Sequence, residues 1–226
     1  MTVTLITGAN KGLGFEAARQ LVAAGHQVWI GARDPDRGKQ AADAVNAQFV
    51  QLDVTDDASV AAAAHSVGDL DVLVNNAGIA GERTEPAQTT AAHLRRVYET
   101  NVFGPVRVLH AFLPILQKSA RPVVVNVSSG LGSISTAAEP GSPWAAFAMV
   151  YSSAKAALNM LTVKYAAAFP DMQVNAVDPG FTATDLNQHR GSQTVAEGAR
   201  VIVQYATIGP AGPSGGFFSS TGPVPW

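Results

Sequence analysis

Tyr151 and Lys155 form the pair of side chains whose types and spacing best fit proton transfer. On a helix, residues four apart lie on the same face about one turn from each other, so the Lys155 ammonium is expected beside the Tyr151 phenol. A free phenol ionises near pH 10, and a neighbouring positive charge favours the phenolate. We therefore expect Tyr151 to act as a general acid, and as a base in reverse. Lowering its pKa by about three units, or roughly 4 kcal/mol, is plausible for a partly buried lysine with a second positive charge beside it.

A glycine-rich segment near the N-terminus is the second candidate, and it reads Thr7-Gly8-Ala9-Asn10-Lys11-Gly12-Leu13-Gly14. Gly8 permits a tight turn, Gly12 lets the backbone approach a pyrophosphate at a helix N-terminus, and Gly14 lets helix and strand pack closely. The spacing is not the Walker pattern, because no Gly-Lys-Ser/Thr closes the loop, and it is not GxGxxG. The segment predicts a nucleotide contact, with a glycine turn that merely helps a helix pack as the alternative.

The elements that must position these residues are indicated by short β-branched runs that alternate with alanine-rich segments. Strands are expected at residues 3–7, 27–32, 49–53, 71–75, 123–128, 173–178 and, last and short, 216–218. Helices are expected near residues 12–24, 35–45, 56–67, 90–118, 150–169 and 193–205. Asn101, Gly104 and Pro105 interrupt the longest helical segment, which should bend or divide there. Asp34 and Pro35 suit the start of the second helix, and Gly25 suits the end of the first.

This alternation predicts one α/β domain over residues 1–226, a doubly wound parallel sheet of about seven strands with helices on both faces. The tail, residues 209–226, is rich in Gly and Pro and should be loop apart from the last short strand. The ligand site of such a sheet lies beyond the carboxyl ends of its strands.

Composition excludes several function classes. The chain has 47% hydrophobic and 14% charged residues and a net charge of −2, so it should fold and has no basic excess for nucleic acid. Its 0 cysteines and 5 scattered histidines argue against a metal site. No charged leader precedes the first strand, and no apolar run approaches the roughly 20 residues that cross a bilayer. We expect a cytoplasmic protein without a membrane partner.

Further motifs follow the expected strands in order: Asn75-Asn76-Ala77-Gly78, then Asn101, Ser128-Ser129, Tyr151 with Lys155, and Asp178-Pro179-Gly180-Phe181-Thr182-Ala183-Thr184. With the Gly-xxx-Gly-x-Gly turn, this ordered set resembles the short-chain dehydrogenase/reductase family over almost the full length. The resemblance implies an NADP(H)-dependent carbonyl reductase, in which hydride reaches a carbonyl carbon while Tyr151 protonates the oxygen. Its partner would be a small carbonyl or alcohol substrate.

The resemblance also implies roles for individual residues. The catalytic set would be Asn101, Ser129, Tyr151 and Lys155: Asn101 anchors a water in the proton relay, Ser129 binds the substrate carbonyl, and Lys155 also holds the nicotinamide ribose. Ser128 is the less favoured of the two serines. The cofactor contacts would be Gly8, Asn10, Lys11, Gly12, Leu13, Gly14, Arg33, Asp53, Val54, Asn75, Ala77, Gly78, Tyr151, Lys155, Pro179, Gly180, Thr182 and Thr184. Thr184 fits the family's carboxamide contact better than Thr182.

Charges after the second strand favour NADPH over NAD. Relatives that use NAD have an acid where this chain has Ala32, and here Arg33 can fork onto a 2′-phosphate, with Lys11 and Arg37 as further cations. Asp34 would weaken this choice if the alignment shifts by one residue. Asp53 resembles the family's adenine contact, and capping of the next helix is its alternative role.

The segment between Ser129 and Tyr151 spans 151 − 129 = 22 positions, which is longer than in compact members of the family. Its residues 139–149, with Pro140, Pro143, Trp144 and Phe147, would form a loop beside the substrate pocket or pack onto the domain. Phe147, Met149 and Phe181 suggest an apolar pocket. Residues 181–192 suggest a mobile lid with Arg190 as a substrate contact, or an ordinary polar loop. The family implies a homodimer or homotetramer, and a monomer if this loop blocks the interface.

Three alternatives remain at this point. An alcohol dehydrogenase that works in the oxidative direction would use the same site. A non-catalytic NADP-binding regulator would need the glycine turn and Arg33 but could dispense with Tyr151. A methyltransferase on a similar sheet would usually have an acid where Ala32 and Arg33 stand.

Overall fold

Short β-branched runs form one sheet in the computed structural model, which describes residues 1–142 and 148–226. The strand order is β3-β2-β1-β4-β5-β6-β7-β8, and every neighbouring pair is parallel except β7 with β8. The strands are β1 (Val3–Thr7), β2 (Gln27–Ala32), β3 (Gln48–Gln51), β4 (Val72–Asn75), β5 (Val123–Val127), β6 (Gln173–Asp178), β7 (Phe217–Ser219) and β8 (Gly222–Pro223). The order reverses between β1 and β4, which is where a doubly wound sheet opens its ligand crevice.

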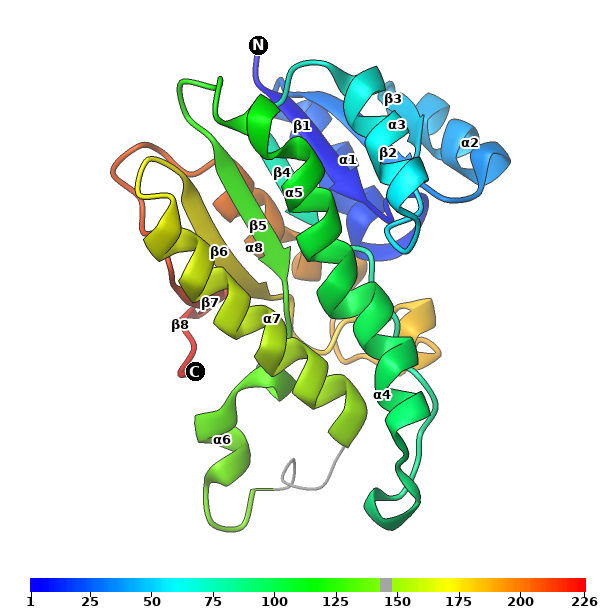
Figure 1. Cartoon of the computed structure of the whole chain (residues 1–226), viewed down its shortest axis with the longest axis vertical. Coiled ribbons are helices and arrows are strands. Elements are labelled where there is room, and N and C mark those ends of the chain that lie inside the picture. Colours follow the sequence, from blue (N-terminus) through cyan, green and yellow to red (C-terminus); the bar gives the residue numbers. More distant parts are fainter. Residues whose placement is uncertain (143–147) are drawn as a thin grey trace.

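Helices cover both faces of this sheet (Figure 1). The α-helices are α1 (Gly12–Ala23), α2 (Pro35–Val45), α3 (Asp57–Val67), α4 (Ala91–Tyr98), α5 (Gly104–Leu116), α6 (Ile134–Ala138), α7 (Met149–Ala168) and α8 (Val195–Ala206). A π-helical turn, η2 (Glu99–Phe103), joins α4 to α5, and short 3-10 turns lie at η1 (Pro86–Gln88), η3 (Gly130–Gly132) and η4 (Asp185–Asn187). Within the described residues, no helix has the length and apolar character needed to cross a bilayer.

The period of two along each strand divides the core between the faces. Ile6 of β1 packs in the cluster with α1, α2 and α8, whereas its neighbour Leu5 packs in the cluster with α3 and α5. Val123 and Val125 of β5 likewise face the first cluster, and Val124 faces the second. Strands apolar on both faces need helices on both faces, so the predicted doubly wound α/β sheet is confirmed.

The structure corrects several expected boundaries. β3 runs from Gln48 to Gln51, so Asp53 lies in the loop beyond it. The tail carries an additional strand, β8, because Gly222, at φ +120°, reverses the chain onto β7. The short helix α6 was not expected. Gly25, at φ +87°, follows the end of α1, and the Asp34 carboxylate caps α2 by accepting from the N–H groups of Asp36 and Arg37, as predicted.

The long helical segment divides where Asn101, Gly104 and Pro105 predicted a break. Pro105 has no N–H, so the Asn101 carbonyl loses its usual partner four residues on, and the chain widens into the π-helical turn. The turn lies toward the carboxyl ends of the strands, the lower half of Figure 1, where α4 and the beginning of α7 also lie. A helix break is thereby placed beside the candidate site.

Candidate active site

The glycine turn after β1 is braced by the segment after β4. Gly8 and Gly12 have φ of +64° and +60°, a region that favours glycine. The Asn76 side chain donates to the carbonyls of Thr7 at 2.9 Å and Gly8 at 3.1 Å, and the Thr7 hydroxyl accepts from the Ala77 N–H at 3.0 Å. Sequence reasoning assigned no role to Asn76, although it lies within a quoted motif.

The N-terminus of α1 directly follows this turn and, among the described residues, has no side-chain cap. Its N-cap Lys11 makes no capping hydrogen bond, and its first turn has no acidic residue. The N–H groups there and the helix dipole therefore favour a phosphate. A Cβ built on Gly12 would meet only the Thr184 methyl, at 3.9 Å, so the space beside the turn is open. Asn10 and Leu13 are half-buried on either side of Lys11 and Gly12.

Tyr151 and Lys155 lie in the first two turns of α7, against the ends of β5 and β6. Lys155 is 4% exposed, and its Nζ donates to the Val127 carbonyl at 2.7 Å. The same Nζ is 5.6 Å from the centre of the Tyr151 ring. Tyr151 is half-buried and shares a hydrogen bond with Ser129. Phenol, hydroxyl and ammonium thus come together at the carboxyl edge of the sheet.

Burial dominates the electrostatics of this pair. Burial and the negative charge of Asp178 raise the pKa of Tyr151, against a smaller lowering by the Ser129 hydrogen bond. In the protein alone, desolvation of the phenol outweighs any gain from the lysine, and the lowering of the Tyr151 pKa expected beside a positively charged nicotinamide stays a prediction. Burial lowers the pKa of Lys155 to about 8, and Asp178 opposes that effect. The ammonium therefore stays mostly charged at neutral pH.

The two serines after β5 face different ways. Ser128 is buried, and its hydroxyl donates to the Asn159 side chain of α7 at 2.5 Å. Asn159 in turn donates to the Gly132 carbonyl at 3.2 Å, which ties η3 to the helix. Ser129 is half-buried, caps η3 by accepting from the Leu131 N–H at 3.2 Å, and keeps its contact with Tyr151. The geometry therefore brings Ser129, rather than Ser128, to the candidate site.

Asn101 is fully buried in η2 and clamps the loop after β4. Its Oδ1 accepts from the Ile79 N–H, and its Nδ2 donates to the Ile79 carbonyl, both at 2.9 Å. The side chain is therefore occupied, and a water in a proton relay would have to bind the main-chain carbonyl that Pro105 leaves without its usual partner. A Cβ built on Gly78 would lie 3.5 Å from Asn101 Oδ1 and 3.8 Å from Lys155 Nζ, so Gly78 sits between them.

Asn75 ends β4 with a buried side chain, whose Oδ1 has no hydrogen-bond partner among the described residues. It is 4% exposed, and its Nδ2 donates to Asn126 at 2.9 Å, which donates to Thr162 of α7 at 2.9 Å. This buried chain of amides links β4, β5 and α7. The hydrogen bond from Asn75 to Asn126 explains why a polar residue ends β4, and the sequence motif did not predict this bond.

The turn after β6 separates the two candidate threonines. Thr182 is 4% exposed, and its hydroxyl donates to the Pro179 carbonyl at 3.1 Å, while Gln193 closes the turn by bonding to both residues. The hydroxyl is therefore used inside the protein, and the predicted contact of Thr182 with the cofactor stays a prediction. Thr184 is half-buried beside Gly12. Gly180, at φ +74°, allows the turn that precedes both threonines.

Residues 181–192 are ordered around η4 and tied to the glycine turn. Lys11 Nζ lies 2.6 Å from Asp185 Oδ2, and His189 Nε2 lies 2.8 Å from Asp185 Oδ1. Arg190 bonds back to the Asn187 carbonyl and the Gln188 side chain, so it points into its own turn rather than towards a substrate. The predicted loop residues Pro143, Trp144 and Phe147 lie outside the described residues.

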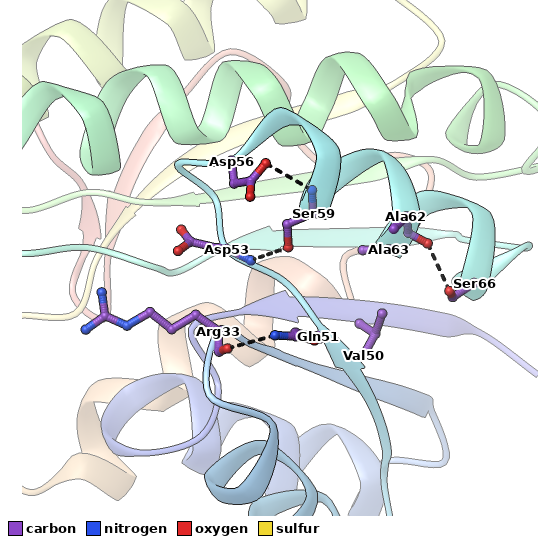
Figure 2. A pocket seen from close by; sticks show the side chains of 9 residues that line it. All are labelled: Arg33, Val50, Gln51, Asp53, Asp56, Ser59, Ala62, Ala63 and Ser66. Atoms are coloured by element: carbon purple, nitrogen blue, oxygen red, sulfur yellow. Dashed lines mark hydrogen bonds between the residues drawn. The ribbon is translucent and has the colours of Figure 1, made fainter.

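A cavity of about 400 Å³ lies between the end of β3 and α3, with Arg33 and Asp53 at its rim (Figure 2). Asp53 accepts from the Thr55 N–H at 2.9 Å and hydroxyl at 2.7 Å, whereas Asp56 caps α3, so the helix-cap alternative for Asp53 is wrong. Partial burial would raise the Asp53 pKa, but the Thr55 hydrogen bonds and nearby arginines hold it below its usual value. Val54, next in the chain, is buried.

The three cations predicted to bind a 2′-phosphate, Arg33, Lys11 and Arg37, have different partners. Lys11 is paired with Asp185, and Arg37 lies 3.5 Å from Asp34. The Asp34 carboxylate caps α2, so it is not available as the acid that NAD-using relatives have after the second strand. Within the described residues, Arg33 has no carboxylate within ion-pair distance, and Figure 2 shows its guanidinium extended on the side of Asp53.

Comparison with known proteins places this arrangement in a family. A family model described as short chain dehydrogenase matches residues 2–195. The chain is 33% identical over 280 residues to (+)-neomenthol dehydrogenase from Arabidopsis thaliana, with 95% of each chain covered. It is 32% identical over 297 residues to (-)-isopiperitenone reductase from Mentha piperita, again with 95% of each covered. The solved structure of an NADPH-bound carbonyl reductase from chicken fatty liver matches 100% of both chains at 31% identity, with a TM-score of 0.86. With these matches over nearly its whole length, the protein belongs to the short-chain dehydrogenase/reductase family of oxidoreductases, as its motifs predicted.

Proposed function

We propose that the protein reduces a ketone or aldehyde to an alcohol with NADPH, and that Tyr151 donates the proton. The observation that carries the proposal is the hydrogen bond between Tyr151 and Ser129 at the carboxyl edge of the sheet, with the buried Lys155 behind it. Two hydroxyls that point to one place can both bond to a carbonyl oxygen and stabilise the charge that develops on it.

The chain's own residues divide the work of the reaction. Bound NADPH would supply a hydride to the carbonyl carbon. Ser129 and Tyr151 hold the oxygen, and the Tyr151 proton moves to that oxygen as the carbon is reduced, which leaves the phenolate on the enzyme. The raised pKa of Tyr151 keeps the phenol protonated in the resting protein, as a donor requires. Lys155, fixed by the Val127 carbonyl, stabilises the phenolate formed.

NADPH is favoured over NADH by the charges after β2. Ala32 puts no carboxylate at the end of the strand, and the carboxylate of Asp34 is used in capping α2. Arg33 is exposed and free to bind a 2′-phosphate through two parallel N–H groups. The chicken carbonyl reductase that matches this chain is described as bound to NADPH, which supports the same choice.

The substrate side is apolar, which favours a carbonyl compound with a hydrocarbon body. Ile134 of α6, Met149 at the start of α7, and Phe181 and Leu186 after β6 are 66%, 41%, 58% and 46% exposed. Large apolar side chains exposed on the segments that follow β5 and β6 and on the first turn of α7 favour an apolar ligand. The two curated relatives are named for neomenthol and isopiperitenone, and we propose apolar ketones as the first substrates to test.

The test is Tyr151→Phe, with Tyr165→Phe as the matched control on the same helix, where Tyr165 stacks on Phe169 instead. NADPH oxidation is followed with a panel of cyclic ketones, aldehydes and quinones. Tyr151→Phe should lose at least about a hundredfold in kcat, with NADPH affinity by fluorescence titration unchanged, because general acid catalysis contributes about 10²–10⁴-fold. Turnover retained by Tyr151→Phe, or absent from the natural protein across the panel, contradicts the proposal.

A further inference from the structure

Asp178 is an acidic side chain at the candidate site that the catalytic set of Asn101, Ser129, Tyr151 and Lys155 leaves without a role. It ends β6, one residue beyond Val177, whose carbonyl accepts from the Ser128 N–H at 2.8 Å. The residue is half-buried. Its carboxylate therefore lies at the same edge of the sheet as the two serines after β5, in a setting that is only partly hydrated.

Both carboxylate oxygens of Asp178 have a fixed environment. Oδ1 accepts from the Gly180 N–H at 3.0 Å. Oδ2 lies over Gly130, where a built Cβ would come within 2.9 Å of it. Gly130 is not among the residues with positive φ, so its backbone would tolerate a side chain, and the close approach of Asp178 is what requires glycine. Because Gly130 follows Ser129 directly, the carboxylate packs on the segment that carries the candidate carbonyl ligand.

Lys155 needs a negative charge nearby. A buried ammonium is costly unless it is paired, and its hydrogen-bond acceptor, the Val127 carbonyl, is neutral. Asp178 lies beyond ion-pair distance of Lys155, so its negative charge acts on Lys155 and Tyr151 through space, and for Lys155 it opposes the fall in pKa that burial causes.

Other charged groups lie on the elements packed against α7. In η2, Glu99 is held by Arg107 at 2.8 Å, and in α4, Arg96 is held by Glu82 at 2.7 Å. None of the remaining titratable residues of α4 has a carboxylate: they are His93, Arg95 and Tyr98. Neither η3 nor β5 carries a titratable side chain. Within the described part of these elements, Asp178 is therefore the carboxylate that remains to balance Lys155.

We propose that Asp178 is a positioning residue of this site: its carboxylate supplies the counter-charge that keeps the buried Lys155 ammonium beside Tyr151, and its contact with Gly130 sets the position of Ser129. The inference deepens the proposed reductase function and rests on it for its catalytic meaning. The effect of the Asp178 charge on the titration of Lys155, however, can be measured in the protein without any turnover.

The first experiment is an NMR titration of protein labelled with ¹³C at lysine Cε, in the natural chain and in Asp178→Asn. Asparagine keeps an oxygen for the Gly180 N–H and removes only the charge. The Lys155 signal, identified by its loss in Lys155→Met, should titrate about one pH unit lower in Asp178→Asn, because an adjacent opposite charge is gone. Asp171→Asn, at the other end of β6, makes the same change in net charge and should leave the titration where it was. An unchanged Lys155 titration in Asp178→Asn overturns the proposal, whether or not any ketone is reduced.

The second experiment tests the contact with Gly130. Gly130→Ala should displace the carboxylate, shift the Lys155 titration in the same direction, and move the alkaline limb of the pH profile of kcat to lower pH. In an Asp178→Ala background, the same substitution has no carboxylate to displace and should add nothing to the Lys155 shift. An equal shift from Gly130→Ala in both backgrounds would show that the glycine acts independently of Asp178. Failure of the reductase proposal would be seen separately, as absence of NADPH oxidation by the natural protein.

Discussion

Gly14→Ala is the most direct test of how the glycine turn is built. Gly14 lies in the first turn of α1 with an ordinary helical backbone, and alanine is favoured over glycine in helices by about 1 kcal/mol. A Cβ at this position would nevertheless lie 2.4 Å from Asn76 Nδ2, 2.9 Å from Ala9 Cα and 3.0 Å from the Gly8 carbonyl. The conflict is therefore steric, and the Asn76 amide is the group that can move.

The size of the effect follows from what Asn76 would lose. Its two hydrogen bonds, to the carbonyls of Thr7 at 2.9 Å and Gly8 at 3.1 Å, are worth about 0.5–1.5 kcal/mol each. Crowding against the backbone of Ala9 adds about 1–3 kcal/mol. After the gain in helix propensity, Gly14→Ala should lower the free energy of unfolding by about 1–5 kcal/mol, and the melting temperature by about 2–20 °C.

The assay is a double-mutant cycle, in which urea unfolding gives the free energy of unfolding of each variant. Gly14→Ala and Asn76→Ala should each destabilise the protein, but the two hydrogen bonds of Asn76 can be lost only once. The double variant should therefore be less destabilised than the sum by about 1–2 kcal/mol. Effects that add to within about 0.5 kcal/mol would refute the reasoning, since Asn76 would then not be the group that Gly14 accommodates.

Three further outcomes are expected at the site itself. Arg33→Ala should weaken NADPH binding by about tenfold or more while NADH binding is unchanged in fluorescence titrations, because a charge-assisted pair with phosphate is worth about 1.5–3 kcal/mol. Ser128→Ala should lower the free energy of unfolding by about 1–2 kcal/mol through its bond to Asn159, whereas Ser129→Ala should chiefly lower kcat; the reverse assignment would contradict the geometry. Reduction should lose rate as pH rises through about 8, where Lys155 gives up its proton, and a profile flat to pH 10 would argue against a charged lysine in the reaction.

The fold was predictable because its signals are local and repeated. Apolar runs at β1, β4, β5 and β6 could be identified as buried strands, and the Pro105 break in the long helix followed from one missing N–H. The edge strand β8 was not predictable, because its two residues have no pattern of their own and pair only through contact with β7. The type of an element could thus be predicted wherever the sequence itself showed the pattern of a strand or a helix.

The candidate site was predictable as a set of positions, but not as a set of orientations. Motif spacing favoured Thr184 over Thr182 without excluding Thr182, and only the fold shows that Thr182 turns its hydroxyl to the Pro179 carbonyl. Lys11 likewise counted as a free cation until the segment after β6 brought Asp185 to it across 174 positions of sequence. Such partners come from distant strands, so no local pattern could reveal them.

Burial explains why the spacing of Tyr151 and Lys155 does not by itself predict the pKa of the Tyr151 phenol. Residues four apart on a helix are neighbours in any environment, but the sign of a pKa shift depends on how much water each group loses. Here desolvation drives the pKa of the phenol up and that of the ammonium down, so both neutral forms are favoured together. Such a pair resists forming a phenolate until further positive charge arrives. A site of this kind suits proton donation, and its use as a base would depend on the charge of an oxidised nicotinamide.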